Sequence, residues 1–219
     1  MIGRIQAKIC GLTDPGEAAA VAAMGADAIG LVFFPKSPRH LSDDNARAVA
    51  DALPTDMARI GVFVDMDADT VLRKAKRCGL TGVQLHGRET PETVERLRDE
   101  GLTVIKGLFA SRSPGLEESG DYRPSAFLAE CGKGTLPGGN AKTWDWSAAR
   151  TLGRGRPLVL AGGLNPDNVI DAVREALPDA VDVSSGVEAS PGRKDLKRVR
   201  AFLEALTRAP RKTPSRRIF

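Results

Sequence analysis

The segment from Pro157 to Glu188 restricts the possible folds of this chain more than any other part of the sequence. It contains two short apolar runs, Leu158–Ala161 and Ala180–Val183, and each run ends abruptly in small residues. Gly162-Gly163 follows the first run, and Ser184-Ser185-Gly186 follows the second. The residues between the runs have a helical pattern. This order of strand, glycine turn, helix and strand predicts a βαβ unit of a parallel sheet.

The helix of this unit is predicted to begin at Asn165, which would cap it, with Pro166 in its first turn. Glycines directly after a strand let backbone N–H groups come close to an anion, and a helix N-terminus adds a positive dipole. We therefore expect the turns at Gly162, Gly163, Ser185 and Gly186 to bind one phosphate group. In a (β/α)8 barrel such a site lies in the loops after strands seven and eight. The alternative is that these glycines only form tight turns.

The rest of the chain repeats the same unit. Its apolar runs are too continuous for strands with one solvent-exposed face. Eight runs alternating with helical segments predict a single closed (β/α)8 barrel, also called a TIM barrel, over residues 1–207. An open doubly wound sheet is the alternative. The fifth connection, residues 111–124, combines prolines and glycines with few apolar residues, so a reduced or irregular fifth helix is expected. The expected strands are residues 4–10, 28–34, 60–64, 82–85, 103–109, 126–131, 158–161 and 180–183.

Composition agrees with one domain and excludes several classes of protein. The chain has 219 residues, 42% of them hydrophobic, which suffices for one core. We find no long apolar run and no basic leader before an apolar run, so no membrane span or signal peptide is expected. Three widely spaced cysteines argue against a disulfide framework and favour the cytoplasm. With two histidines and no Cys-x-x-Cys pattern, no metal site is expected.

The formal charge is +4, and part of this excess lies in a basic tail, residues 208–219, which is expected to be flexible and solvated. The basic residues of the tail are not interleaved with aromatic side chains that could stack on bases, and no basic stripe occurs elsewhere. Nucleic acid is therefore not an expected partner.

Several motifs in the chain occur in the same order as in the phosphoribosylanthranilate isomerase family, whose members act in tryptophan biosynthesis. The resemblance covers nearly the whole chain except the tail, and the motifs are specific only in combination. They are Lys8-Ile9-Cys10-Gly11-Leu12-Thr13, Gly25-Ala26-Asp27-Ala28, Ser37-Pro38-Arg39, Gly61-Val62-Phe63-Val64, Val83-Gln84-Leu85-His86-Gly87, Ala161-Gly162-Gly163-Leu164 and Asp182-Val183-Ser184-Ser185-Gly186-Val187-Glu188.

The resemblance implies a cofactor-free isomerase of the aldose–ketose type, which carries out an Amadori rearrangement of N-(5'-phosphoribosyl)anthranilate. This chemistry needs an acid for the ring oxygen and a base for the C2' proton, on opposite sides of the sugar. The family's base is the cysteine of the first-strand motif, here Cys10, and an environment that favours its thiolate would suit the role. Cys78 and Cys131 are expected to be ordinary buried residues.

The family's acid is an aspartate at the end of strand six, and this chain has Glu130 there instead. The carboxyl group is kept but is one methylene longer. The following segment also departs from the family pattern, with Gly138-Gly139-Asn140-Ala141 in place of Gly-Gly-Thr-Gly. Asp145 or a water molecule is the alternative proton donor, should Glu130 point to solvent.

Two further residues are expected to bind substrate. The planar fork of Arg39 would hold the anthranilate carboxylate, and Asp182 would bind a ribose hydroxyl or orient Cys10. Gln84 and His86 are expected only to line the site.

Three functions remain open at this point. The first is the isomerase, a monomer or homodimer acting on a small phosphosugar. The second is a different phosphosugar enzyme, such as an epimerase-like barrel, although its metal ligands are missing. The third is a phosphosugar-binding barrel whose acid–base pair has drifted. A related aminosugar, as in histidine biosynthesis, would undergo the same class of reaction.

Overall fold

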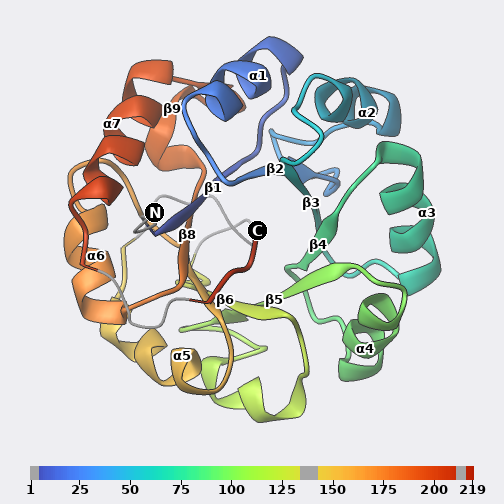
Figure 1. The fold of residues 1–219 in the computed structure, drawn as a ribbon. Coiled ribbons are helices and arrows are strands. Elements are labelled where there is room, and N and C mark those ends of the chain that lie inside the picture. The colour runs from blue at the N-terminus through green and yellow to red at the C-terminus, as the bar shows by residue number, and fades with distance from the viewer. Residues whose placement is uncertain (1–4, 134–142, 211–215) are drawn as a thin grey trace.

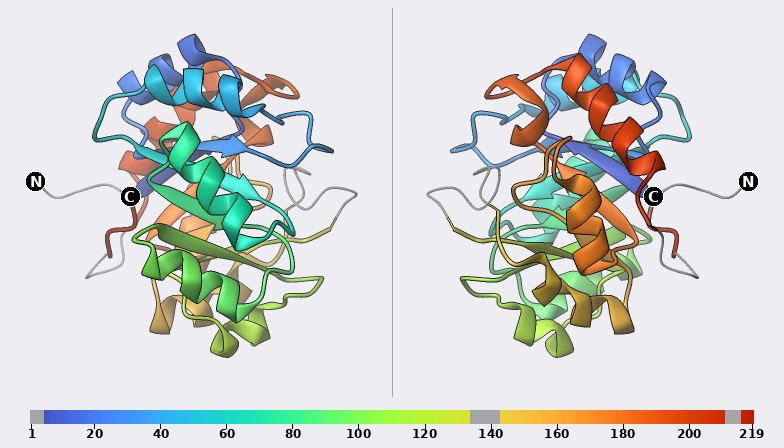
Figure 2. Two further views of the ribbon diagram at one scale, coloured as in Figure 1. Left: turned by 90° about the vertical axis from the view of Figure 1, so that its right-hand side faces the viewer. Right: turned by 90° about the vertical axis from the view of Figure 1, so that its left-hand side faces the viewer.

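Eight parallel strands close into a barrel in the order β1 to β8, and β8 pairs with β1. The computed structural model describes residues 5–133, 143–210 and 216–219. Helices surround the barrel (Figures 1 and 2), so the predicted (β/α)8 fold is confirmed. The strands are β1 (Gln6–Cys10), β2 (Ala28–Val32), β3 (Ala58–Phe63), β4 (Gly82–Leu85), β5 (Thr103–Phe109), β6 (Ala126–Glu130), β7 (Leu158–Leu160) and β8 (Ala180–Val183).

Local sequence signals account for the ends of the regular helices. Asp14, Ser42 and Asp67 cap three of them, each accepting a hydrogen bond from a backbone amide of the first turn. Gly79, in the left-handed conformation, ends the third of these. The regular helices are α1 (Pro15–Ala23), α2 (Asp43–Asp51), α3 (Ala68–Cys78), α4 (Pro91–Asp99), α6 (Val169–Ala176) and α7 (Leu196–Thr207).

The fifth and sixth connections lack a full α-helix. The fifth is a 3-10 helix, η1 (Leu116–Asp121), as the prolines and glycines predicted. The sixth combines η2 (Trp146–Thr151) with the one-turn helix α5 (Leu152–Gly155).

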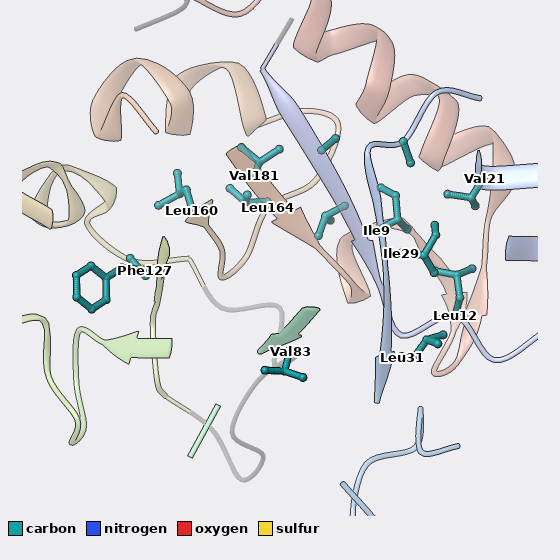
Figure 3. Packing of buried hydrophobic residues seen from close by; sticks show 14 of the residues in the cluster. Ile9, Leu12, Val21, Ile29, Leu31, Val83, Phe127, Leu160, Leu164 and Val181 are labelled. Atoms are coloured by element: carbon teal, nitrogen blue, oxygen red, sulfur yellow. The ribbon is translucent and has the colours of Figure 1, made fainter. Parts of the chain in front are cut away.

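Side chains alternate along each strand between the helices and the barrel interior. Outward residues such as Ile9 and Ile29 pack with Val21 of α1 in the layer between strands and helices (Figure 3). On β1, the inward residues are Gln6 at one end, Lys8 in the middle and Cys10 at the carboxyl end. The apolar interior includes several alanines from four strands and Ala161 at the end of β7, which leave room for polar side chains there.

The sequence-based start of α6 was three or four residues early. The side-chain oxygen of Asn165 accepts hydrogen bonds from the amides of Asp167 and Asn168. This closes a turn before the helix, which begins at Val169. Residues 185–194 also contain a short helix and hairpin that were not predicted, η3 (Ser185–Val187), β9 (Glu188–Ser190) and β10 (Arg193–Lys194).

Arg216, Ile218 and Phe219, which lie in the segment expected to be a flexible tail, contact the barrel. Arg216 donates to both carboxylate oxygens of Asp179, and the amides of Ile218 and Phe219 donate to the side chain of Gln6. Ile218 and Phe219 pack against the apolar interior, and the C-terminus lies near the middle of the ring in Figure 1. Apolar burial and these hydrogen bonds together close the end of the barrel opposite to Cys10.

Candidate active site

A pocket opens at the carboxyl ends of the strands, where function is concentrated in this fold. The empty space at this opening is about 760 Å³ and includes part of the open solvent. All eight residues predicted from the sequence for catalysis or binding line it. They are Cys10, Arg39, Glu130, Gly162, Gly163, Asp182, Ser185 and Gly186.

Cys10 is the last residue of β1, and its side chain is 7% exposed. Gly30 on β2 leaves space for the thiol, because a Cβ there would lie 2.6 Å from Sγ. Burial raises the pKa of the Cys10 thiol, while the positive charges of Lys8 and Lys194 oppose that effect. The effect of burial is the larger one, so the pKa of the thiol is raised on balance.

Glu130 is the last residue of β6 and is also nearly buried. Its Oε2 atom lies 2.8 Å from Nε2 of His86, whose Nδ1 atom lies 3.1 Å from Nε2 of Gln84. The two residues expected only to line the site thus form a hydrogen-bonded chain with Glu130. Strands β7 and β8 separate Glu130 from Cys10 in the barrel, so the carboxyl group and the thiol enter the pocket from different sides.

Arg39 is held by a partner that the sequence analysis missed. Its Nε and Nη2 atoms donate to the two carboxylate oxygens of Glu188, at 2.8 and 2.6 Å. Lys194 Nζ donates to the same carboxylate at 2.8 Å and to the carbonyl of Ser184. Burial alone would raise the pKa of Glu188, but the hydrogen bonds from Arg39 and the charge of Lys194 hold it below its usual value.

One edge of the Arg39 fork is therefore occupied, and only the edge formed by Nη1 and Nη2 remains for a ligand carboxylate. Glu188 and Lys194 belong to the β9–β10 hairpin, which turns at Pro191-Gly192. A Pro-Gly pair is a turn signal and could have indicated this hairpin.

Asp182 lies one strand away from Cys10, on β8, with its side chain in the barrel. Its Oδ1 atom accepts a hydrogen bond from Nζ of Lys8 at 2.9 Å. The register of β1 and β8 places Lys8 and Asp182 opposite each other. One of the two roles considered for Asp182, orienting Cys10, would thus act through Lys8.

The two small-residue turns meet in the pocket as predicted. Gly162 and Gly163 adopt left-handed φ angles of 87° and 73°, and within the described residues their amides donate no hydrogen bond. Gly186 approaches the neighbouring turn so closely that a Cβ on it would lie 1.8 Å from the carbonyl oxygen of Leu164. Ser185 and Gly186 form the first turn of η3, where backbone amides have no partner in the helix itself.

Two tryptophans fix the first of these turns. Trp144 Nε1 donates to the carbonyl of Ala161 at 3.0 Å, and Trp146 Nε1 donates to that of Gly162 at 3.2 Å. Their role was not predicted. Asp145 between them is exposed and caps η2, away from the pocket. The divergent residues 138–141 lie outside the described residues.

Two features are absent from the described ranges. There, no group of three His, Cys, Asp or Glu side chains is arranged to hold a metal ion. No helix among these residues has both the length and the apolar character needed to cross a membrane.

Comparison with known proteins identifies the relatives of this chain. The family model described as N-(5'phosphoribosyl)anthranilate (PRA) isomerase matches residues 7–205. The N-(5'-phosphoribosyl)anthranilate isomerase of Desulfatibacillum aliphaticivorans is 49% identical over 215 residues, which cover 98% of this chain and 99% of the relative.

Solved structures agree. The phosphoribosyl anthranilate isomerase of Thermotoga maritima superposes with a TM-score of 0.85 at 40% identity, covering 93% of this chain and 98% of that one. A phosphoribosyl anthranilate isomerase in complex with reduced 1-(o-carboxyphenylamino)-1-deoxyribulose 5-phosphate superposes with a TM-score of 0.82 at 38% identity, also covering 93% of this chain and 98% of that one. This chain therefore belongs to the N-(5'-phosphoribosyl)anthranilate isomerase family.

Proposed function

We propose that this chain converts N-(5'-phosphoribosyl)anthranilate into 1-(2-carboxyphenylamino)-1-deoxyribulose 5-phosphate, with Cys10 as the base and Glu130 as the acid. One observation carries the assignment of roles. A thiol and a carboxyl group from different strands enter one pocket, which also holds an arginine edge and two glycine turns for anions. The substrate has two anionic ends, a phosphate and a carboxylate, with the reacting sugar between them.

Ring opening is the first step of the proposed mechanism. Protonated Glu130 gives its proton to the ring oxygen, and the bond between that oxygen and C1' breaks. The lone pair of the anthranilate nitrogen forms a C1'=N double bond, which leaves an iminium ion. His86 donates to or accepts from Glu130 according to its tautomer, so it can keep the acid in place through both protonation states.

Proton removal from C2' is the second step. The Cys10 thiolate takes the proton, and the electron pair of the C2'–H bond forms a C1'=C2' double bond. The π electrons of the C=N bond return to nitrogen. The resulting enolamine becomes the ketone when C1' gains a proton and the 2'-hydroxyl loses one.

The two anionic groups of the substrate would fix the sugar between acid and base. The phosphate would bind to the amides of Gly162, Gly163, Ser185 and Gly186, and the carboxylate to the free edge of Arg39. Positioning of this kind lowers the barrier because the reacting atoms no longer have to find each other. These steps need no cofactor and no metal ion.

The proposal includes a cytoplasmic location, which the three buried free cysteines support. The proposal includes a monomer or a homodimer as the form that acts on the phosphosugar.

A turnover assay tests the function. Purified protein is expected to convert N-(5'-phosphoribosyl)anthranilate without added metal or cofactor, with product identified by mass spectrometry and NMR. Binding without turnover would favour the non-catalytic barrel instead. The same assay with the aminosugar of histidine biosynthesis, which lacks the anthranilate carboxylate, measures how much specificity depends on Arg39.

The phosphate site gives a separate prediction. Inorganic phosphate is expected to inhibit competitively, and Gly186→Ala should raise both its inhibition constant and KM by about tenfold or more, which corresponds to losing about one good hydrogen bond to a charged group. The reason is steric, since a Cβ there meets the Leu164 carbonyl.

Gly155→Ala is the matched control, because a Cβ on Gly155 meets nothing within 4 Å. Unchanged phosphate inhibition in Gly186→Ala, in a folded protein, would place the anion elsewhere.

A further inference from the structure

Lys8 is a fully buried lysine that the mechanism above does not use. Its side chain is 0% exposed, and it points into the barrel two residues before Cys10 on the same face of β1. Ala28 lies opposite it on β2, and the apolar interior of the barrel also contains Ala126 and Ala180. A buried ammonium group needs a partner of opposite charge, because removing a charge from water is costly.

The ion pair with Asp182 satisfies the charge of Lys8 but does not explain its presence. Buried ion pairs are often no more stabilising than apolar residues of similar volume. An apolar residue could fill this position of the barrel, as Ile60 and Ile105 do elsewhere in the interior. The reason for a lysine at this position therefore lies in where its ammonium group stands relative to the pocket.

Gly30 shows how close Lys8 lies to Cys10. A Cβ built on Gly30 would lie 2.6 Å from Sγ of Cys10 and 3.0 Å from Nζ of Lys8. The thiol and the ammonium group therefore share the small space above Gly30, and Nζ also donates to Asp182 Oδ1 at 2.9 Å.

We propose that Lys8 is a positioning residue for proton abstraction, and that its ammonium group is the counter-charge of the Cys10 thiolate. Asp182 holds the ammonium group beneath the sulfur. The inference rests on the proposed role of Cys10 as the base. In the step itself the thiolate gains the C2' proton and becomes neutral, while Lys8 and Asp182 remain a matched pair of charges.

Four charged groups influence the thiol, and they come from four elements. Burial raises the pKa of Cys10, Lys8 on β1 lowers it most, Asp182 on β8 raises it, and Lys194 on β10 lowers it. Arg39, after β2, also interacts with the thiolate. Glu188 binds both Arg39 and Lys194 and so offsets one of their two charges, as Asp182 offsets that of Lys8. Among the groups that lower the pKa of the thiol, Lys8 has the largest effect.

The surroundings of Lys8 favour its charged form. Burial disfavours its charged form, but the negative charges of Asp182 and of the Cys10 thiolate outweigh that effect and raise its pKa. The charged ammonium group is the form that the role of counter-charge requires.

The test is a pH titration of the thiolate by its ultraviolet absorbance, with the matching Cys10→Ser variant as the blank for each protein. In Lys8→Met the midpoint is expected to rise by about one pH unit or more, since an opposite charge within about 4–6 Å shifts a pKa by about 1–3 units. Turnover at neutral pH should fall by about tenfold or more, and the rising limb of the pH–rate profile should move to higher pH.

Two further variants keep the test decisive. Lys8→Met with Asp182→Asn removes the whole pair, so no buried charge is left alone, and its midpoint is still expected above that of the wild type. Lys106→Met is the control. It removes another fully buried lysine, paired with Glu89 at 2.7 Å, and should leave the Cys10 midpoint unchanged.

An unchanged midpoint in both Lys8 variants would overturn the inference. A raised midpoint supports it even if the protein does not turn over N-(5'-phosphoribosyl)anthranilate, because the titration observes the thiolate and not the reaction. Failure of the proposed function is therefore distinguishable from failure of the role of Lys8.

Discussion

Cys10→Ala is expected to lower turnover by about 10²–10⁴-fold, the range that a positioned acid or base contributes, while the protein stays folded. The substitution removes one sulfur atom at the wall of a pocket. It leaves the strand ladder of β1 intact and uncovers no charge except the thiol-facing side of Lys8, which keeps its bond to Asp182. KM should change far less than kcat, since the thiol contributes to the transition state more than to binding.

Cys78→Ala is the matched control for this variant. Cys78 is also fully buried, but it lies in the core on α3, outside the pocket. It should lose some thermal stability and keep its turnover. Turnover of Cys10→Ala within a few-fold of the wild type would remove Cys10 from the mechanism.

The barrel was predictable because its strands are buried on both sides. Such strands have continuous apolar runs, and the caps at Ser42 and Asp67 and the glycine at Gly79 separate them clearly from the helices. The pocket followed from the fold, since the residues at the carboxyl ends of the strands meet there. This is why all eight predicted residues line one cavity.

The partners of these residues were not predictable, because they come from distant parts of the chain. Glu188 lies 149 residues from Arg39, and Asp182 lies 174 residues from Lys8. No local pattern shows that one edge of Arg39 is already bound or that a lysine lies beneath Cys10. The contacts of Arg216–Phe219 with Gln6 and Asp179 could not be predicted either. A basic, proline-containing tail has no periodicity that reveals where it binds.

For Glu130, the position was predictable from the sequence but the partner was not. Its place at the end of β6 was predicted, but its bond to His86 was not, because His86 follows β4, which β5 separates from β6. In the family pattern the residue is an aspartate, whose shorter side chain would not reach as far.

Glu130→Gln is expected to lower kcat by at least about a hundredfold, the lower end of what general acid–base catalysis contributes. The amide has the shape of the carboxyl group and can still bond to His86, but it cannot give a proton to the ring oxygen. The fold should therefore be unaffected, and a loss of turnover reports the missing proton. Steady-state kinetics measure the turnover, and thermal unfolding measures whether the fold is unaffected.

Glu130→Asp is the companion variant and should retain substantially more turnover than Glu130→Gln, because it keeps an acid and restores the residue of the family pattern. Its remaining deficit measures how far the pocket is fitted to the longer side chain and to the bond with His86. Asp145, the alternative donor, is exposed and engaged with Ser147 at the start of η2. Near-normal turnover in Glu130→Gln would mean that the ring oxygen receives its proton from water, with the carboxyl group of Glu130 serving only to hold His86.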